Sequence, residues 1–279
     1  MLFDCAGKSL DLSAPRIMGI VNVTPDSFSD GGKFFSRDAA LRQALKLVED
    51  GADILDIGGE STRPGSDPVA VQEEIDRVVP AIEAIRAEVD VPISIDTMKA
   101  DVMRAAVSAG AGLINDVNAL RSEGALQAAA DLDVPVCLMH MQGTPQTMQQ
   151  EPGYTDVVAE VEQFLLERVE HCEKAGIKAD RIMLDPGFGF GKKARHNLRL
   201  MKHLSRFTQH PYPVLVGVSR KSIIGDMLKV SVEERLAGSL ALASIAVWQG
   251  AKLIRTHDVR DTAQAVKLTQ HVQQVEDFD

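Results

Sequence analysis

Residues 17–32, IMGIVNVTPDSFSDGG, join a short apolar run to a polar loop. Apolar side chains fill the run almost continuously up to Asn22, which predicts a strand covered on both faces, as in a parallel sheet. Pro25 and the Gly31-Gly32 pair disfavour a helix directly afterwards, and Ser36 is expected to cap the helix that follows. The loop carries oxygen-bearing side chains that can hold a hard cation or hydrogen-bond a ligand. We therefore expect a buried parallel strand that ends in a functional loop.

The same unit of amphipathic helix, glycine stop, apolar strand and polar strand end recurs along the chain, for example in EDGADILDIG, SAGAGLINDV and WQGAKLIRTHD. The polar residues that close successive strands are Asn22, Asp56, Asp96, Asn115, His140, Asp185, Ser219 and His257. Eight βα units predict a TIM (β/α)8 barrel, an α/β fold in which the carboxyl ends of all strands share one rim. A doubly wound open sheet also alternates strands and helices, but it would scatter these residues. The barrel predicts that they meet at one mouth.

Two further features complete the predicted architecture. Residues 1–12 suggest a β-hairpin, LFDCA and SLDL on either side of Gly7-Lys8, and this hairpin is expected to cover the barrel floor. No linker rich in Pro or Ser and no block of charge divides the chain. Residues 1–279 are therefore expected to form a single domain.

Composition argues against several classes of protein. The 279 residues are 45% hydrophobic and 25% charged, without an apolar run long enough to cross a membrane. Asp4 interrupts the place where a signal peptide would be apolar, and three widely spaced cysteines suggest no disulfide framework, so we expect a cytoplasmic protein. The net charge of -10 argues against nucleic acid or an anionic membrane as the main partner.

Three candidate ligand-binding residues end buried runs, where an uncompensated polar group is costly: Asp96, Asn115 and Asp185. Taken singly, each carboxylate has the alternative role of capping the next helix. Their convergence at one rim favours a ligand instead. Asp185 can accept paired hydrogen bonds from an N–H and an amino group, and Asn115 offers both a donor and an acceptor. This set suits an aminated heterocycle better than a sugar phosphate.

Cationic residues occur in the loops that follow other strands. Arg63 lies in GGESTRPG, where glycines allow close backbone approach and the guanidinium suits a carboxylate or phosphate, although a solvated surface arginine is the alternative. Lys221 lies in VGVSRKS near the start of a short predicted helix, a common phosphate position in barrels. The Walker motif GxxxxGK[ST] is absent, which gives little support to nucleotide hydrolysis. Arg255 and His257 are two residues apart, so an extended strand would place both on one side to hold an anion.

Eight segments, in order and along nearly the full chain, resemble the dihydropteroate synthase family: NVTPDSFSDGG, DIGGESTRPG, ISIDT, IND, LMHMQGTP, LDPGFGFGK, GVSRKS and IRTHDV. The resemblance implies an eight-stranded α/β barrel that joins p-aminobenzoate to 6-hydroxymethyl-7,8-dihydropterin diphosphate in folate synthesis. It also implies release of diphosphate with Mg²⁺ and inhibition by sulfonamides, which mimic p-aminobenzoate.

The resemblance further implies a role for each matching residue. The pterin is expected at Asp96, Asn115, Asp185 and Lys221, and diphosphate at Arg63, Arg255 and His257. The Mg²⁺ ligand is expected to be Asn22. The p-aminobenzoate site is expected to include Phe28, Thr62, Arg63, Pro64, Phe190, Ser219 and Lys221. The residues expected to be catalytic are Asp96, Lys221, Arg255 and His257. A homodimer is also implied, and the apolar helix predicted over residues 236–248 supports it.

The chemistry of these residues agrees with that assignment. Mg²⁺, Arg255 and His257 can stabilise charge on the departing diphosphate, while nearby carboxylates favour a cationic pterin methylene. A dissociative, SN1-like reaction is expected, with direct attack by the arylamine and no nucleophilic side chain. His140 is interpreted as a wall of the site rather than a base.

Two other functions remain open at this point. A pterin-dependent methyltransferase would use a similar barrel and pocket, but it is not expected to carry the STRPG and SRKS segments together. A non-catalytic pterin or anion sensor would need the pocket without the metal-binding first loop.

Overall fold

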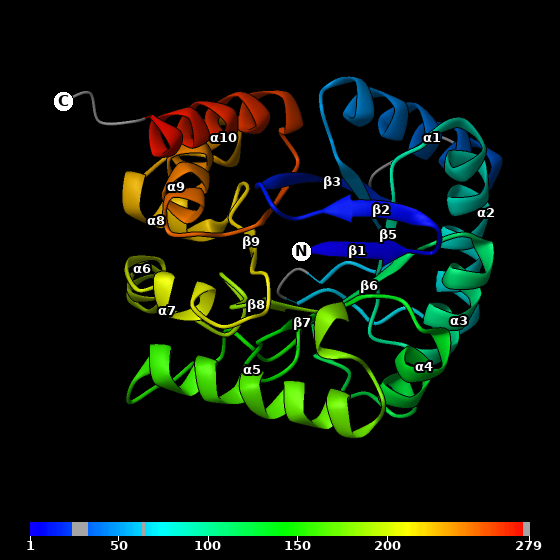
Figure 1. Ribbon diagram of the computed structural model, residues 1–279, viewed down its shortest axis with the longest axis horizontal. Helices are drawn as coiled ribbons and strands as arrows, with labels where there is room; N and C mark the ends of the chain where they lie inside the picture. Colours follow the sequence, from blue (N-terminus) through cyan, green and yellow to red (C-terminus); the bar gives the residue numbers. More distant parts are fainter. Residues whose placement is uncertain (24–32, 63–64, 276–279) are drawn as a thin grey trace.

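Eight parallel strands form one sheet in the order β8-β7-β6-β5-β4-β3-β10-β9 (Figure 1). Their bounds are β3 Arg16–Asn22, β4 Ile54–Gly58, β5 Ile93–Asp96, β6 Leu113–Asp116, β7 Val136–Met139, β8 Ile182–Asp185, β9 Leu215–Gly217 and β10 Leu253–Thr256. A bridge between Leu184 and Val214 brings the two end strands together, and the Leu184 N–H donates to the Pro213 carbonyl oxygen at 3.0 Å. The sheet is thus nearly closed, and the predicted TIM barrel is confirmed. This computed structural model describes residues 1–23, 33–62 and 65–275, with the backbone alone over 33–36.

Helices surround the barrel and cover the outer face of the sheet (Figure 1). They are α1 Lys33–Glu49, α2 Val71–Glu88, α3 Ala100–Ala109, α4 Ala125–Leu132, α5 Val157–Lys174, α6 Ala194–Lys202, α7 Ser205–Thr208, α8 Ser222–Leu228, α9 Leu236–Trp248 and α10 Val259–Gln274. Short 3-10 turns lie at Ala179–Arg181 and Val232–Glu234. Since α1 begins at Lys33, Ser36 lies inside this helix, and the expectation that it caps the helix is wrong.

The N-terminal hairpin closes the barrel floor, as predicted. Its strands are β1 Leu2–Cys5 and β2 Lys8–Asp11. They bury Phe3, Cys5 and Leu10, together with Leu12 just after β2, against one interior apolar residue from each of seven barrel strands. At Gly112, just before β6, a Cβ atom would lie only 2.2 Å from the Cys5 carbonyl oxygen, so the hairpin needs glycine there.

The register of the strands sets the height of each polar residue inside the barrel. Asn22 pairs with Gly58, Gly58 with Asp96, and Asp96 with Asn115, so these positions form one level of the rim. Asp56 pairs with Ile20 and lies one level deeper, because β4 continues to Gly58. The sequence pattern had placed Asp56 at the strand end, and the structure moves it inside.

The described residues contain no helix that is long and apolar enough to cross a bilayer. All three cysteines are free and buried, as expected from their spacing. The cytoplasmic location and the lack of a nucleic-acid partner stay predictions.

Candidate active site

A buried ionic network occupies the centre of the barrel mouth. Arg255, on β10, donates from Nε to Asp56 Oδ2 at 2.6 Å and from Nη2 to Asp96 Oδ2 at 2.8 Å. Asp56 Oδ2 also accepts a hydrogen bond from Asn115 Nδ2 at 3.2 Å. Three residues predicted from distant parts of the sequence therefore meet, and Asp56 joins them.

The Arg255 guanidinium donates hydrogen bonds to two carboxylates in this network, those of Asp56 and Asp96. Burial raises the pKa of Asp96; the Arg255 charge opposes this rise, and the Asp56 charge adds to it. Burial would lower the pKa of Arg255, but the charges of Asp56 and Asp96 outweigh it and raise the pKa above its usual range. Arg255 is thus a permanent cation. Within the described part of the chain, Asp56 Oδ1 has no hydrogen-bond partner, so this interior retains a free acceptor.

Asp185 and Lys221 form the second charged part of the mouth. Asp185 ends β8, and its Oδ1 accepts the Gly187 N–H at 2.7 Å. Burial raises the pKa of Asp185 to about 6. Lys221 Nζ lies 4.1 Å from the centre of the Phe190 ring, and burial, together with Arg255, lowers the pKa of Lys221 to about 8. Both groups are therefore charged at neutral pH.

Ser219 and His257 connect the ends of β9 and β10. Ser219 Oγ accepts the backbone N–H of His257 at 3.2 Å and lies 3.0 Å from its Nδ1. Burial, with a contribution from Arg255, lowers the pKa of His257 to about 4, so the ring is neutral at pH 7. The Ser219 hydroxyl can donate to Nδ1, and this places the ring hydrogen on Nε2, where it can meet an anion.

Arg255 and His257 do not lie on one side of a common strand, although their spacing in the sequence predicts that they do. Strand β10 ends at Thr256, so His257 lies beyond it and the same-side rule for extended strands does not apply. The side chain of Arg255 binds Asp56 and Asp96, whereas that of His257 contacts Ser219. Each residue can still offer a separate donor at the mouth.

Sequence reasoning missed Lys192, which the structure buries beside the site. Its ammonium donates to the carbonyl oxygens of Gly187 at 2.8 Å, Phe190 at 2.9 Å and His140 at 3.1 Å, and contacts His140 Nδ1 at 2.9 Å. Burial lowers the pKa of His140 to about 2, and the Lys192 charge adds to this effect. A neutral His140 agrees with its interpretation as a wall. In the GFGFGK segment, the only signal for Lys192 was its place after closely spaced glycines.

Two of the remaining predicted residues, Asn22 and Thr62, lie within the described part of the chain. Asn22 ends β3 and is half-buried, and Thr62 is half-buried in the loop after β4. Phe28, Arg63 and Pro64 lie outside the described residues. Within residues 1–23, 33–62 and 65–275, no group of three or more His, Cys, Asp or Glu side chains has metal-binding geometry.

Comparison with known proteins decides between the remaining interpretations. The model of the family described as pterin binding enzyme matches residues 18–257. A dihydropteroate synthase from Escherichia coli K12 is 52% identical over 264 residues, covering 95% of this chain and 94% of the relative. The Haemophilus influenzae dihydropteroate synthase is 54% identical over 263 residues, covering 94% and 96%. This chain belongs to the dihydropteroate synthase family. It is therefore an enzyme, a transferase.

Solved structures of dihydropteroate synthases share the whole fold. The Xanthomonas albilineans dihydropteroate synthase with 4-aminobenzoic acid has a TM-score of 0.94 and 54% identity, with 99% of each chain covered. The same organism's enzyme in complex with 7,8-dihydropteroate has a TM-score of 0.90 and 50% identity, covering 99% of this chain and 100% of that one. Membership of the dihydropteroate synthase family sets aside the methyltransferase and sensor alternatives.

Proposed function

We propose that this enzyme joins p-aminobenzoate to 6-hydroxymethyl-7,8-dihydropterin diphosphate, giving 7,8-dihydropteroate and diphosphate. The observation that carries the proposal is the convergence of Asp96, Asn115 and Asp185 with two cations, Lys221 and Arg255, at one mouth. Family membership and the ligands named for the Xanthomonas albilineans structures support the choice of substrates.

The buried polar residues suit the pterin ring. The Asp185 carboxylate retains lone pairs for paired N–H donors beyond its bond to Gly187. Asn115 donates from Nδ2 to Asp56, which leaves its Oδ1 to accept from the ring. Lys221 adds a donor, and Asp96 a further acceptor. Asp56 is thus a positioning residue that fixes the orientation of the Asn115 amide.

The hydrogen-bond donors at the mouth suit the diphosphate. Arg255 and the Nε2 hydrogen of His257 are the donors that we assign to it, and the resemblance adds Arg63. The Asn22 amide oxygen fits Mg²⁺, which takes oxygen ligands and commonly retains water and substrate phosphates in place of further side chains. When bound, Mg²⁺ supplies positive charge that stabilises the departing oxygens.

The reaction proceeds in a dissociative, SN1-like manner. The bond between the pterin methylene carbon and the diphosphate oxygen breaks, and its electron pair leaves with the diphosphate. Buried carboxylates, Asp96 and Asp56 among them, favour positive charge on the methylene. The arylamine nitrogen then forms the new C–N bond and loses a proton. Thr62, Phe190, Ser219 and Lys221 are proposed to border p-aminobenzoate, with Phe28, Arg63 and Pro64 from the resemblance.

Purified protein with both substrates tests the reaction. We expect equal amounts of diphosphate and 7,8-dihydropteroate with Mg²⁺ and a large loss of both with EDTA. Diphosphate release without pteroate, or full activity in EDTA, would contradict the respective parts of the proposal. Pterin diphosphate with ¹⁸O in the bridging position tests the dissociative step, since reversible cleavage scrambles the label without p-aminobenzoate.

We also propose a homodimer that forms through α9 and α10. Helix α9 is apolar nearly throughout, yet Ala237, Ala241, Ile245 and Trp248 are exposed along it at spacings of three and four residues. On the adjacent helix α10, Leu268 and Val272 are 66% and 52% exposed. Exposed apolar side chains on two adjacent helices favour a protein partner, and a second copy of the chain is the partner that we propose.

A further inference from the structure

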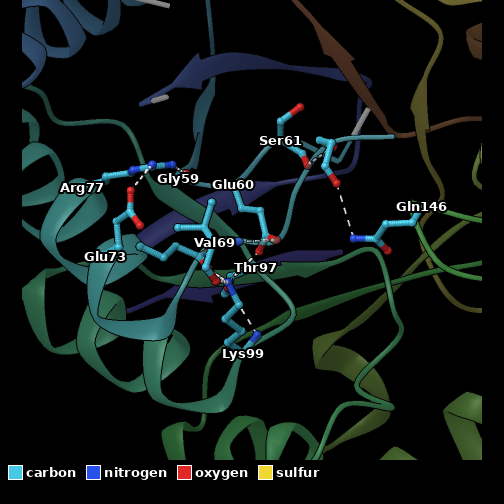
Figure 2. A network of polar contacts seen from close by, with 11 residues as sticks. Gly59, Glu60, Ser61, Val69, Glu73, Arg77, Thr97, Lys99 and Gln146 are labelled. Carbon is cyan, nitrogen blue, oxygen red and sulfur yellow. Dashed lines mark hydrogen bonds and ion pairs between the residues drawn. The ribbon is translucent and has the colours of Figure 1, made fainter. Parts of the chain in front are cut away.

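The β4–α2 loop, described over residues 59–62 and 65–70, is held at its base by a half-buried lysine from another strand end. Lys99 follows β5 and precedes α3. Its ammonium donates to Glu60 Oε2 at 2.7 Å and to the Val69 carbonyl oxygen at 2.6 Å, one on each side of the loop (Figure 2). It also donates to Glu74 Oε2 on α2 at 2.5 Å. One side chain thus joins the beginning of the loop, its end and the next helix.

The two sides of the loop are also joined directly. Glu60 Oε1 accepts the Val69 N–H at 3.2 Å, and the Gly59 carbonyl oxygen accepts from Arg77 Nη1 of α2 at 2.7 Å (Figure 2). At Gly59 a Cβ atom would lie 2.7 Å from Val78 Cγ1, so the loop begins pressed against α2. The base is therefore a defined structure and not a free hinge.

The burial of Glu74 requires a positively charged partner, which Lys99 supplies. Glu74 is fully buried, and a buried carboxylate without a charged partner is costly. Burial raises the pKa of Glu74, against the effect of the hydrogen bond from Lys99. Burial would lower the pKa of Lys99, but hydrogen bonds to Glu60 and Glu74 raise it above its usual range. The ammonium is therefore charged throughout the working pH range.

The outer part of the loop contacts the segment after β7. The Gly65 N–H donates to the Pro145 carbonyl oxygen at 3.3 Å. Gln146 Nε2 donates to the Ser66 carbonyl oxygen at 3.4 Å (Figure 2). Ser66 Oγ donates across the loop to the Ser61 carbonyl oxygen at 2.6 Å. Thr62, a proposed wall of the p-aminobenzoate site, follows Ser61 directly, so its position depends on the base and on these outer contacts.

Lys99 is also connected to the pterin end of the mouth. It lies three residues after Asp96, and its N–H donates to Thr97 Oγ1 at 3.3 Å. The Thr97 N–H donates to the Asn115 carbonyl oxygen at 3.1 Å. The turn 96–99 therefore carries an expected pterin residue at one end and the support of the loop at the other.

We propose that Lys99 is a positioning residue for the second substrate: it fixes the β4–α2 loop and thereby sets the affinity for p-aminobenzoate. This inference rests on the proposed function, because the assignment of Thr62 to that substrate does. It assigns no contact between Lys99 and either substrate.

Steady-state kinetics of Lys99→Met test this role. We expect KM for p-aminobenzoate to rise by about tenfold, since small displacements of positioning groups have effects of this size, with the Kd of pterin diphosphate within about twofold of wild type. Lys99→Arg should restore much of the affinity, because it keeps the charge and several donors. Lys174→Met is the matched control: it removes an exposed Lys–Glu pair on α5 and should change neither value.

A second variant, Glu60→Ala, tests the same inference if Lys99→Met does not fold. Glu60→Ala releases the loop but keeps the pair between Lys99 and buried Glu74, and it should shift KM for p-aminobenzoate in the same direction. An unchanged KM in a folded Lys99→Met or Glu60→Ala protein would overturn the inference, as would equal losses of affinity for both substrates. Failure of the wild-type protein to form pteroate would instead overturn the proposed function.

Discussion

Burial displaces the pKa values of the residues proposed to bind the pterin. Asp185 and Lys221 have pKa values displaced toward each other, to about 6 and about 8, because both lie at the covered rim of the barrel. Titratable groups with values displaced toward neutrality are typical of functional sites. Asp185 is ionised above its pKa and Lys221 below its pKa, so both charges coexist only between the two values.

Asp185→Asn should weaken binding of pterin diphosphate by about 1.5 to 3 kcal/mol, the usual value of hydrogen bonds to a charged group. The amide has only one acceptor oxygen, and this oxygen already serves the Gly187 N–H in the native structure. Calorimetry of the folded variant measures the change. An affinity equal to that of wild type would remove Asp185 from the pterin site.

The pH profile of kcat/KM for pterin diphosphate should be bell-shaped. Protonation of Asp96, whose pKa burial raises to about 7, and of Asp185 should reduce it on the acid side, and loss of the Lys221 proton should reduce it above about pH 8. In Lys221→Arg the alkaline limb should move upward, because arginine keeps its proton. An alkaline limb that stays in place in this variant would assign it to another group.

The sequence predicts those site residues that the pattern of their neighbours in the chain identifies. Asp96, Asn115 and Asp185 each follow a short apolar run, so strand periodicity and the barrel rule suffice to place them. Lys99 and Lys192 could not be found in this way, because a lysine near a strand end usually extends into solvent. Their roles depend on oxygen atoms from residues distant in the sequence, such as the Glu74 carboxylate for Lys99 and the His140 carbonyl for Lys192.

The hairpin and the barrel strands have different roles at the two ends of the barrel. The strand ends supply the polar mouth, whereas β1 and β2 seal the opposite end with apolar side chains. Periodicity predicted both, but it placed some boundaries wrongly: β4 extends past Asp56 to Gly58, and α1 begins before Ser36. Such limits depend on register and on backbone hydrogen bonds, which local composition fixes poorly.

The hairpin should contribute strongly to stability. Phe3 is 1% exposed in the barrel floor, and Phe3→Ala should lower the free energy of unfolding by about 3 to 5 kcal/mol, as for other buried aromatic residues. Leu2→Ala, one residue away on the same strand, is the control because Leu2 is 63% exposed. Urea unfolding measures both. Equal, small effects would show that the hairpin does not support the barrel.

The exposed faces of α9 and α10 predict that two copies of the chain assemble. Light scattering at micromolar concentration should give twice the chain mass of 30.2 kDa. Trp248→Glu should yield monomers, because it places a charge in a surface that is proposed to be buried. Leu198→Glu on α6, where Leu198 is 44% exposed, should leave the dimer intact. A monomeric wild-type protein would refute the proposed dimer.

The depth of the two proposed subsites gives an order of binding. The pterin residues Asp96, Asn115 and Asp185 lie inside the mouth, each at most 9% exposed, whereas Thr62 and Phe190 at its border are half-buried. A ligand seated at the border would obstruct the interior, so pterin diphosphate should enter first. Its bound ring and diphosphate would then complete the surface on which p-aminobenzoate rests.

Calorimetry with a sulfonamide, as a mimic of p-aminobenzoate, tests directly whether the bound pterin and diphosphate complete the second subsite. One titration uses the protein alone, and the other uses protein saturated with pterin, diphosphate and Mg²⁺. We expect appreciable binding only in the second titration. Ordered binding requires that the affinity for the sulfonamide be higher in the saturated protein than in the protein alone. Equal affinity in both titrations would contradict ordered assembly of one site from the strand ends.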